Sequence, residues 1–157
     1  MHGMSNARFL AGALFLLLPG IAAAQISVVK NADMSFGSLG ASASSGTAIV
    51  DPLTGVVSVT GGVVNLGGAP SAASFTVTAP TPGNKSYTIV LPASAVLTGP
   101  GAATMTVDTF TSNPPCCAGT VNNMRTEVVT VGATLHVAAN QAAGNYSGTA
   151  TFIVTRP

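Results

Sequence analysis

Short runs of alternating apolar and small polar side chains recur along the chain, and they restrict its fold more than any other feature. Residues 74–78 and 104–110 show the pattern, and so do residues 149–154 near the end. A period of two is typical of β-strands that bury one face. The runs recur at about 8 to 14 residues with Gly, Pro, Asn or Asp between them, and no amphipathic helical segment separates them. This spacing favours an antiparallel sandwich over a βαβ fold.

The composition favours strands over helices. Glu and Lys, which normally cover helix surfaces, are nearly absent, because only 6% of the residues are charged. Thr and Val are abundant instead, and their branched side chains suit a pleated sheet. The sequence therefore predicts an all-β fold, an immunoglobulin-like antiparallel β-sandwich with a Greek key and about 8–10 short strands.

Turn chemistry suggests where the strands end. Gly61-Gly62 is expected to join residues 56–60 and 63–66 in a hairpin. Asp51-Pro52 is expected to open a turn, and residues 93–97 could form a single helical turn. The remaining expected strands are residues 26–29, 47–50, 74–78, 87–91, 104–110, 127–137 and 149–154.

The first 24 residues have the pattern of a secretory signal peptide. Arg8 precedes an apolar run over residues 9–18, and Ala22-Ala23-Ala24 then supplies small residues before Gln25. The run is shorter than the roughly 20 residues of a membrane span, which disfavours the alternative of a retained anchor. We expect residues 1–24 to be removed, leaving residues 25–157 as a single secreted β-sandwich domain without a stable membrane span.

The charges of residues 25–157 cancel. A chain with no net charge does not attract phosphates, so nucleic acid is not expected as a partner. It also lacks the repulsion that keeps molecules apart, which favours self-association. The four cations are Lys30, Lys85, Arg125 and Arg156, and the four anions are Asp33, Asp51, Asp108 and Glu127.

Few residues could carry chemistry. His136, the single histidine after residue 24, could be a general base or a metal ligand. Its place between Leu135 and Val137 predicts instead an outward position on a strand. A zinc site needs three or four ligands at local spacing, which the chain does not supply. We therefore expect no catalytic residue, no cofactor and no metal, and we do not expect an enzyme.

Cys116 and Cys117 are adjacent, which is unusual in a chain expected to be exported to an oxidising compartment. Neighbouring Cα atoms lie about 3.8 Å apart, below the usual disulfide range of about 4.4 to 6.8 Å. A vicinal disulfide is the leading hypothesis, and intermolecular bridges or two free thiols are the alternatives.

Tyr146 follows a Gly-Asn corner and precedes the last expected strand. It is a candidate for a tyrosine corner, in which the hydroxyl binds a nearby backbone group. An ordinary half-buried tyrosine is the alternative.

Several segments resemble a known family. Asp-Met-Ser-Phe-Gly at 33–37, residues 87–92, and above all residues 131–135 with 139–149 resemble the secreted bacterial domain of unknown function 4402. That family is similar in outline to fimbrial and spore-coat-U-like pilin subunits, which are immunoglobulin-like sandwiches that polymerise by lending strands. The resemblance implies a Gram-negative exported protein in the periplasm or at the cell surface, with no catalytic residues. The segments 114–117 and 155–157 depart from the expected pattern.

These observations predict an exported structural or adhesive protein, a pilin-like subunit of a surface fibre or coat. The expected partners are other copies or related subunits, together with a chaperone and an usher. Ile26, Val28 and Val29 are the candidate donor strand. The alternative is a monomeric secreted binding module or adhesin with an unknown ligand, and an enzyme using His136 is the least favoured reading.

Overall fold

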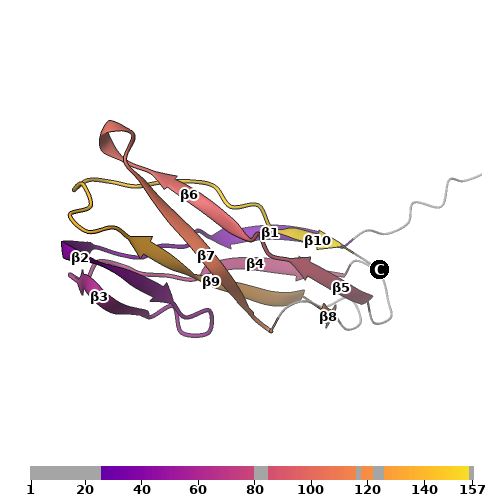
Figure 1. The fold of residues 1–157 in the computed structure, drawn as a ribbon. Helices are drawn as coiled ribbons and strands as arrows, with labels where there is room; N and C mark the ends of the chain where they lie inside the picture. Colours follow the sequence, from indigo (N-terminus) through magenta and orange to yellow (C-terminus); the bar gives the residue numbers. More distant parts are fainter. Residues whose placement is uncertain (1–25, 80–84, 116–117, 122–125, 156–157) are drawn as a thin grey trace, which may run out of the picture.

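The computed structural model describes residues 26–79, 85–115, 118–121 and 126–155. Within these ranges the chain forms ten β-strands and a single 3-10 turn, all strand pairs are antiparallel, and no helix is long and apolar enough to cross a membrane (Figure 1). The predicted all-β sandwich is confirmed. The elements are β1 (Ser27–Ala32), β2 (Leu39–Val50), β3 (Val57–Asn65), β4 (Ala73–Thr78), β5 (Lys85–Val90), β6 (Ser94–Thr98), η1 (Pro100–Ala102), β7 (Thr104–Asn113), β8 (Ala118–Val121), β9 (Thr126–Val137) and β10 (Ile153–Thr155).

The first four strands make one long two-stranded ribbon. β1 and β2 follow one another along its first arm, and β3 and β4 return along the second. The turn between the arms forms around Asp51, whose Oδ1 accepts hydrogen bonds from the backbone N–H groups of Leu53 and Thr54, at 2.9 and 2.8 Å. The predicted turn at Asp51 is therefore confirmed.

β9 holds the ribbon in the sheet by changing partners half-way. Its first half pairs with β4 and its second half with β2, so the larger sheet has the order β1-β4-β9-β2-β3. The change falls near Gly132, where a Cβ would collide with the carbonyl oxygen of Val50. Only glycine lets the two backbones approach this closely.

β7 follows the opposite edge of β9, and β6 pairs with β7. A bulge interrupts the β7–β9 ladder between Asp108 and Thr111, and Thr109 within it has a φ of 49°. The smaller sheet has the order β10-β5-β8 and lies at the end of the molecule where β4 and the first half of β9 run (Figure 1). β7 stays paired with β9 on both sides of the bulge.

The core divides into two clusters of buried side chains. One, around Val50, Val107 and Leu135, belongs to β2, β3, β7 and the second half of β9. The other, around Val77 and Tyr87, joins the first half of β9 and β4 to β5. The strands that carry the two clusters lie toward opposite ends of an elongated domain (Figure 1).

The predicted hairpin at Gly61-Gly62 is wrong. Both glycines lie inside β3, which runs without a break opposite β2. The register there skips from Ala41 to Gly46 in β2, so extra residues of β2 bulge out against the two glycines. A Cβ on Gly62 would collide with the Ser44 carbonyl oxygen, so the glycine pair makes room for a bulge and does not form a turn.

Two further predictions need correction. Residues 93–97 do not form a helical turn, because most of this segment belongs to β6 and is paired with β7 from Ser94 to Thr98. Of the predicted strand over residues 149–154, only Ile153 and Val154 lie in a strand, β10, which pairs with β5. The preceding residues turn Phe152 inward, where its ring lies 5.4 Å from that of Phe75 in an edge-to-face contact.

Candidate functional site

A groove of about 1240 Å³ opens the sandwich along one side. Its walls come from the inner row of β1, from β4 and β9, and from the segment that leads into β10. Apolar side chains such as Val28, Phe75 and Phe152 line much of it, so the groove is continuous with the core. A cavity of this size with apolar walls is a candidate binding site.

The groove exists because the two sheets are left open on this side. β1 and β10 are edge strands, each with one strand partner among the described residues. The segment between β9 and β10 makes a single bridge to β6, in which Thr98 and Ser147 exchange backbone hydrogen bonds of 2.8 and 3.1 Å. The free edges of β1 and β10 leave backbone N–H and C=O groups available for pairing.

The groove carries almost no charge. Lys30 and Asp33 are the charged side chains among its lining residues, and they form an exposed salt bridge with an Nζ–Oδ1 distance of 2.7 Å. Because they pair with one another at the rim, the interior offers apolar contact and no net charge. An occupant would be selected by shape and hydrophobicity.

The candidate donor residues lie beside the groove. Ile26 is half-buried against the core cluster that contains Tyr87. Val28 and Val29 belong to β1, where they pair with Val77 and Thr76 of β4 and stay 42% and 58% exposed. Val28 and Val29 are therefore paired with their own sheet but largely exposed, whereas Ile26 packs against the core.

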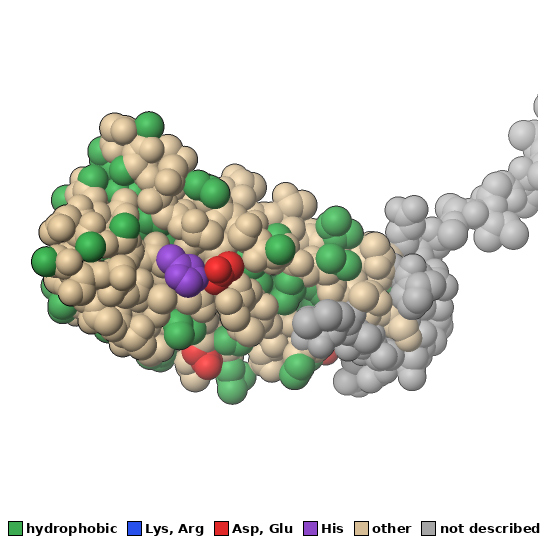
Figure 2. Space-filling model, in the orientation of Figure 1, with side chains coloured by type: hydrophobic (Ala, Val, Ile, Leu, Met, Phe, Trp, Pro, Cys, Tyr) green, Lys and Arg blue, Asp and Glu red, His purple; other side chains and the backbone are tan. Residues whose placement is uncertain are grey.

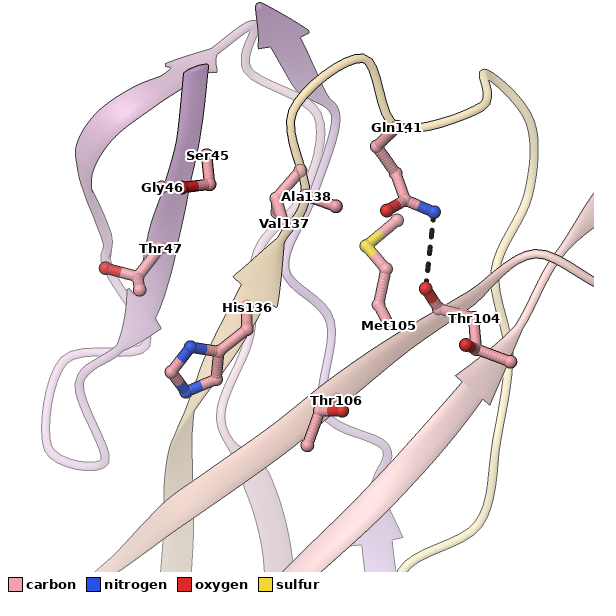
Figure 3. A pocket seen from close by; sticks show the side chains of 10 residues that line it. All are labelled: Ser45, Gly46, Thr47, Thr104, Met105, Thr106, His136, Val137, Ala138 and Gln141. Carbon is pink, nitrogen blue, oxygen red and sulfur yellow. Dashed lines mark hydrogen bonds between the residues drawn. The ribbon is translucent and has the colours of Figure 1, made fainter. Parts of the chain in front are cut away.

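A smaller cleft of about 370 Å³ lies where β9 ends and its neighbours β2 and β7 run on (Figure 3). His136 projects from β9 on its outer, exposed face, as its alternation with buried Leu135 and Val137 predicts. Its direct neighbours across the sheet are Thr47 of β2 and Thr106 of β7. The cleft is thus lined by an imidazole and several hydroxyl groups.

His136 is paired with an acid that the sequence did not suggest as its partner. Its Nε2 lies 2.9 Å from Oδ1 of Asp108, and Figure 2 shows the histidine beside an acidic side chain on this face. This hydrogen bond, followed by one of 3.0 Å from Thr109 Oγ1, lowers the pKa of Asp108. Among the described residues, no hydrogen bond joins His136 to a hydroxyl that could serve as a nucleophile.

No group of three or more metal-binding side chains occurs in the described part of the chain. His136 and Asp108 are two ligands, fewer than a structural or catalytic zinc site uses.

Tyr146 anchors the segment between β9 and β10. Its hydroxyl donates a 2.8 Å hydrogen bond to the carbonyl oxygen of Ala142 and accepts one of 2.8 Å from Gln141. Gln141 also donates to the carbonyl oxygen of Thr104, the bond drawn in Figure 3. A hydroxyl bonded to the backbone a few residues upstream is the arrangement found in tyrosine corners.

A second tyrosine contact was not foreseen from the sequence. Tyr87 of β5 is almost wholly buried, and its hydroxyl donates a 2.6 Å hydrogen bond to Oε2 of Glu127 on β9. Burial, and then the hydrogen bond and charge of Glu127, raise the pKa of Tyr87. The bond ties the smaller sheet to the larger one, and nothing in the spacing of residues 87 and 127 signals it.

Some predictions fall on residues that the structure does not describe. Cys116 and Cys117, with their proposed vicinal disulfide, lie outside the described ranges, as does the proposed signal peptide.

The profile of a family described as "Domain of unknown function (DUF4402)" matches residues 26–155. The chain belongs to the DUF4402 family. No curated protein and no solved structure matches the chain. The DUF4402 match begins one residue before β1 and ends with the last residue of β10, so it covers both sheets and the groove between them.

Proposed function

We propose that this DUF4402 protein is an exported structural subunit, pilin-like in its mode of assembly, that builds a surface fibre or coat. The observation that supports this most is the side of the sandwich left open between β1 and β10. A free edge beside an apolar groove is suited to receive an extended strand, whose backbone pairs with the edge while alternate side chains enter the groove.

The edges carry little protection against such pairing. Natural proteins block exposed edges with charges, prolines or bulges. β1 has one charged residue, Lys30, whose charge is already paired with Asp33, and one bulge, at the register shift between Lys30 and Ala32. The zero formal charge of residues 25–157 adds no repulsion between copies. The paired edge charge and the zero net charge both favour association of copies over a monomeric state.

Assembly of the cleaved chain tests the proposal. Residues 25–157 should form oligomers in size-exclusion chromatography with light scattering, and fibres or sheets in electron microscopy, with sizes that grow with concentration. Deleting residues 25–31 should shorten these assemblies. A chain that stays strictly monomeric at millimolar concentration, with or without related subunits, a chaperone and an usher, would argue against the proposal.

The cleft beside His136 favours a second candidate, a monomeric secreted binding module or adhesin. Its lining is uncharged apart from the imidazole and mixes apolar groups with hydroxyl groups, and Thr47 and Thr106 are the direct cross-strand neighbours of His136. Such a lining suits a ligand rich in hydroxyl groups. A glycan array probed with the monomer would support this candidate only if binding is lost in Thr47→Val and His136→Phe variants.

A further inference from the structure

We propose that β3 is a contact surface for a second copy of this chain: the free edges of the two β3 strands pair antiparallel about a two-fold axis. This inference goes beyond the proposed function, because the contact uses neither the groove nor the edges of β1 and β10. Each copy keeps all of its own strands, and the two larger sheets join edge to edge.

β3 has the longest free edge among the described strands. It spans nine residues and pairs only with β2, so its other edge has no strand partner in the described part of the chain (Figure 1). The other edge strands are β1, β6, β8 and β10, which span six, five, four and three residues. β1 also carries Lys30 and a register shift, and β6 is bridged to Ser147. Short length, charges and prolines commonly protect an edge, and β3 has none of the three.

The middle of β3 does not obstruct a partner strand. The bulge of the β2–β3 ladder is carried by β2, whose extra residues lie against Gly61 and Gly62 on the side away from the free edge. Gly61 has the single positive φ of the strand, 64°. We therefore expect backbone pairing on both sides of the glycine pair, with a local change of twist at the pair.

The charge of this edge fits a second copy. No Lys, Arg, Asp or Glu occurs between Asp51 and Lys85, so the edge offers no charge that would select a charged partner or repel its own copy. In an antiparallel ladder, alternate residues of an edge strand direct their N–H and C=O groups away from the existing partner. A strand that meets its own copy about a two-fold axis is antiparallel by symmetry, so the two edges satisfy one another.

Exposed valines at the two ends of β3 indicate the register. Val56, just before the strand, is 61% exposed and Val64 is 55% exposed. The carbonyl oxygen of Val56 accepts a 3.0 Å hydrogen bond from the Asp51 N–H group, so the pairing with β2 continues to this residue. Side chains directly opposite each other in a ladder lie on the same face. Pairing Val56 of each copy with Val64 of the other covers four exposed valines and puts Thr60 on the two-fold axis.

A single cysteine detects this pairing. In a background of Cys116→Ser and Cys117→Ser, Thr60→Cys places the two substituted residues opposite each other, where Cα atoms lie about 4.5 to 5.5 Å apart, within disulfide range. We expect oxidation of residues 25–157 to give a disulfide-linked dimer. Ser58→Cys is the matched control, because it is exposed on the same strand. In this register its two copies lie about 13 Å apart along the strands, beyond disulfide range.

A charge on the axis should break the dimer. We expect Thr60→Lys to raise the dimer dissociation constant about ten-fold or more in analytical ultracentrifugation, because two like charges then meet across the contact. Thr60 Oγ1 also shares a 2.7 Å hydrogen bond with Thr47 Oγ1 of β2. Thr47→Val removes this hydrogen bond without changing the edge, so we expect this control to dimerise like the unsubstituted chain.

The outcomes separate this inference from the proposed function. Pairing through β3 closes at two copies, whereas a fibre or coat grows with concentration. If Ser58→Cys cross-links as readily as Thr60→Cys, or if Thr60→Lys dimerises as well as Thr47→Val, pairing through β3 is wrong and the proposed fibre is untouched. If the β3 dimer forms and nothing larger appears at any concentration, the fibre is wrong and the pairing stands. A chain that stays monomeric overturns both.

Discussion

β1 and β2 lie on the same arm of one ribbon, yet their surroundings differ. β2 lies between β3 and β9, and its Ala48 and Val50 are completely buried. Among the described strands β1 pairs only with β4, and it buries none of its side chains. Both strands therefore have backbone pairing. Of the two, only β2 buries side chains, because it has neighbours on both edges and a covered inner face. We expect stability to come mainly from the β2 half of the ribbon, with less from the β1 half, and association to involve edge strands.

The largest effect is expected where the ribbon changes its pairing with β9. A Cβ introduced by Gly132→Ala would collide with the carbonyl oxygen of Val50, so the two backbones must separate. We expect a loss of about 4 kcal/mol or more in the free energy of unfolding, measured by urea denaturation. Gly40→Ala in β2 is the control, because its nearest neighbour would be Leu66 Cδ1 at an ordinary 3.4 Å. Equal losses of unfolding free energy in Gly132→Ala and Gly40→Ala would show that the close approach of the backbones at Gly132 does not require glycine.

Truncating one valine in each half tests the comparison directly. Val50→Ala removes two methyl groups from a fully buried site, and we expect it to cost about 2–4 kcal/mol in unfolding free energy. Val29→Ala alters a side chain that is 58% exposed, and the expected change is below about 0.5 kcal/mol. If the two variants lost similar stability in dilute solution, where the chain is monomeric, β1 would contribute to the core more than its exposure indicates.

The bond between the two sheets should have an intermediate effect. Tyr87→Phe removes the hydrogen bond to Glu127 and is expected to cost about 1.5–3 kcal/mol, because the acceptor is a carboxylate. Folding raises the pKa of Tyr87. The tyrosine therefore contributes its full stabilisation below pH ~10, the usual tyrosine pKa, and this contribution to the unfolding free energy declines as the pH rises toward the raised pKa of the folded state. Unfolding free energies of both proteins should converge in strong alkali, and a constant difference would contradict this cause.

The exposed pair on the outer face should matter least. Folding lowers the pKa of Asp108, so its stabilising contribution is present above the ordinary carboxyl range and is lost as the pH falls through the lowered value. We expect Asp108→Asn to lower the unfolding midpoint slightly at pH 7 and not at all near pH 2. Asp33→Asn, at an exposed salt bridge of β1, provides the control. If the difference in unfolding midpoint between the wild type and Asp108→Asn grew as the pH fell, the proposed direction of the pKa effect would be wrong.

The exposed surface around His136 shows what a local sequence pattern can and cannot predict. Alternation around His136 was enough to place it outside and its two neighbours inside, because side chains of a strand point to opposite faces. The pairing with Asp108 could not be predicted from the sequence, because it depends on which strand lies beside β9 and on the bulge at Thr109. Turn residues were equally ambiguous. Gly61-Gly62 has the composition of a hairpin, but it faces a bulge in the partner strand.

By itself, the sequence determined the class of fold, since period-two alternation and the scarcity of helix-forming residues can be read locally. Only the tertiary structure decided that β9 pairs with both arms of the ribbon and that β1 and β10 leave a groove between them. The physical reason is that alternation specifies which face of a strand is apolar. Which strand becomes its neighbour, and whether a second layer covers it, is set by contacts between residues far apart in the chain.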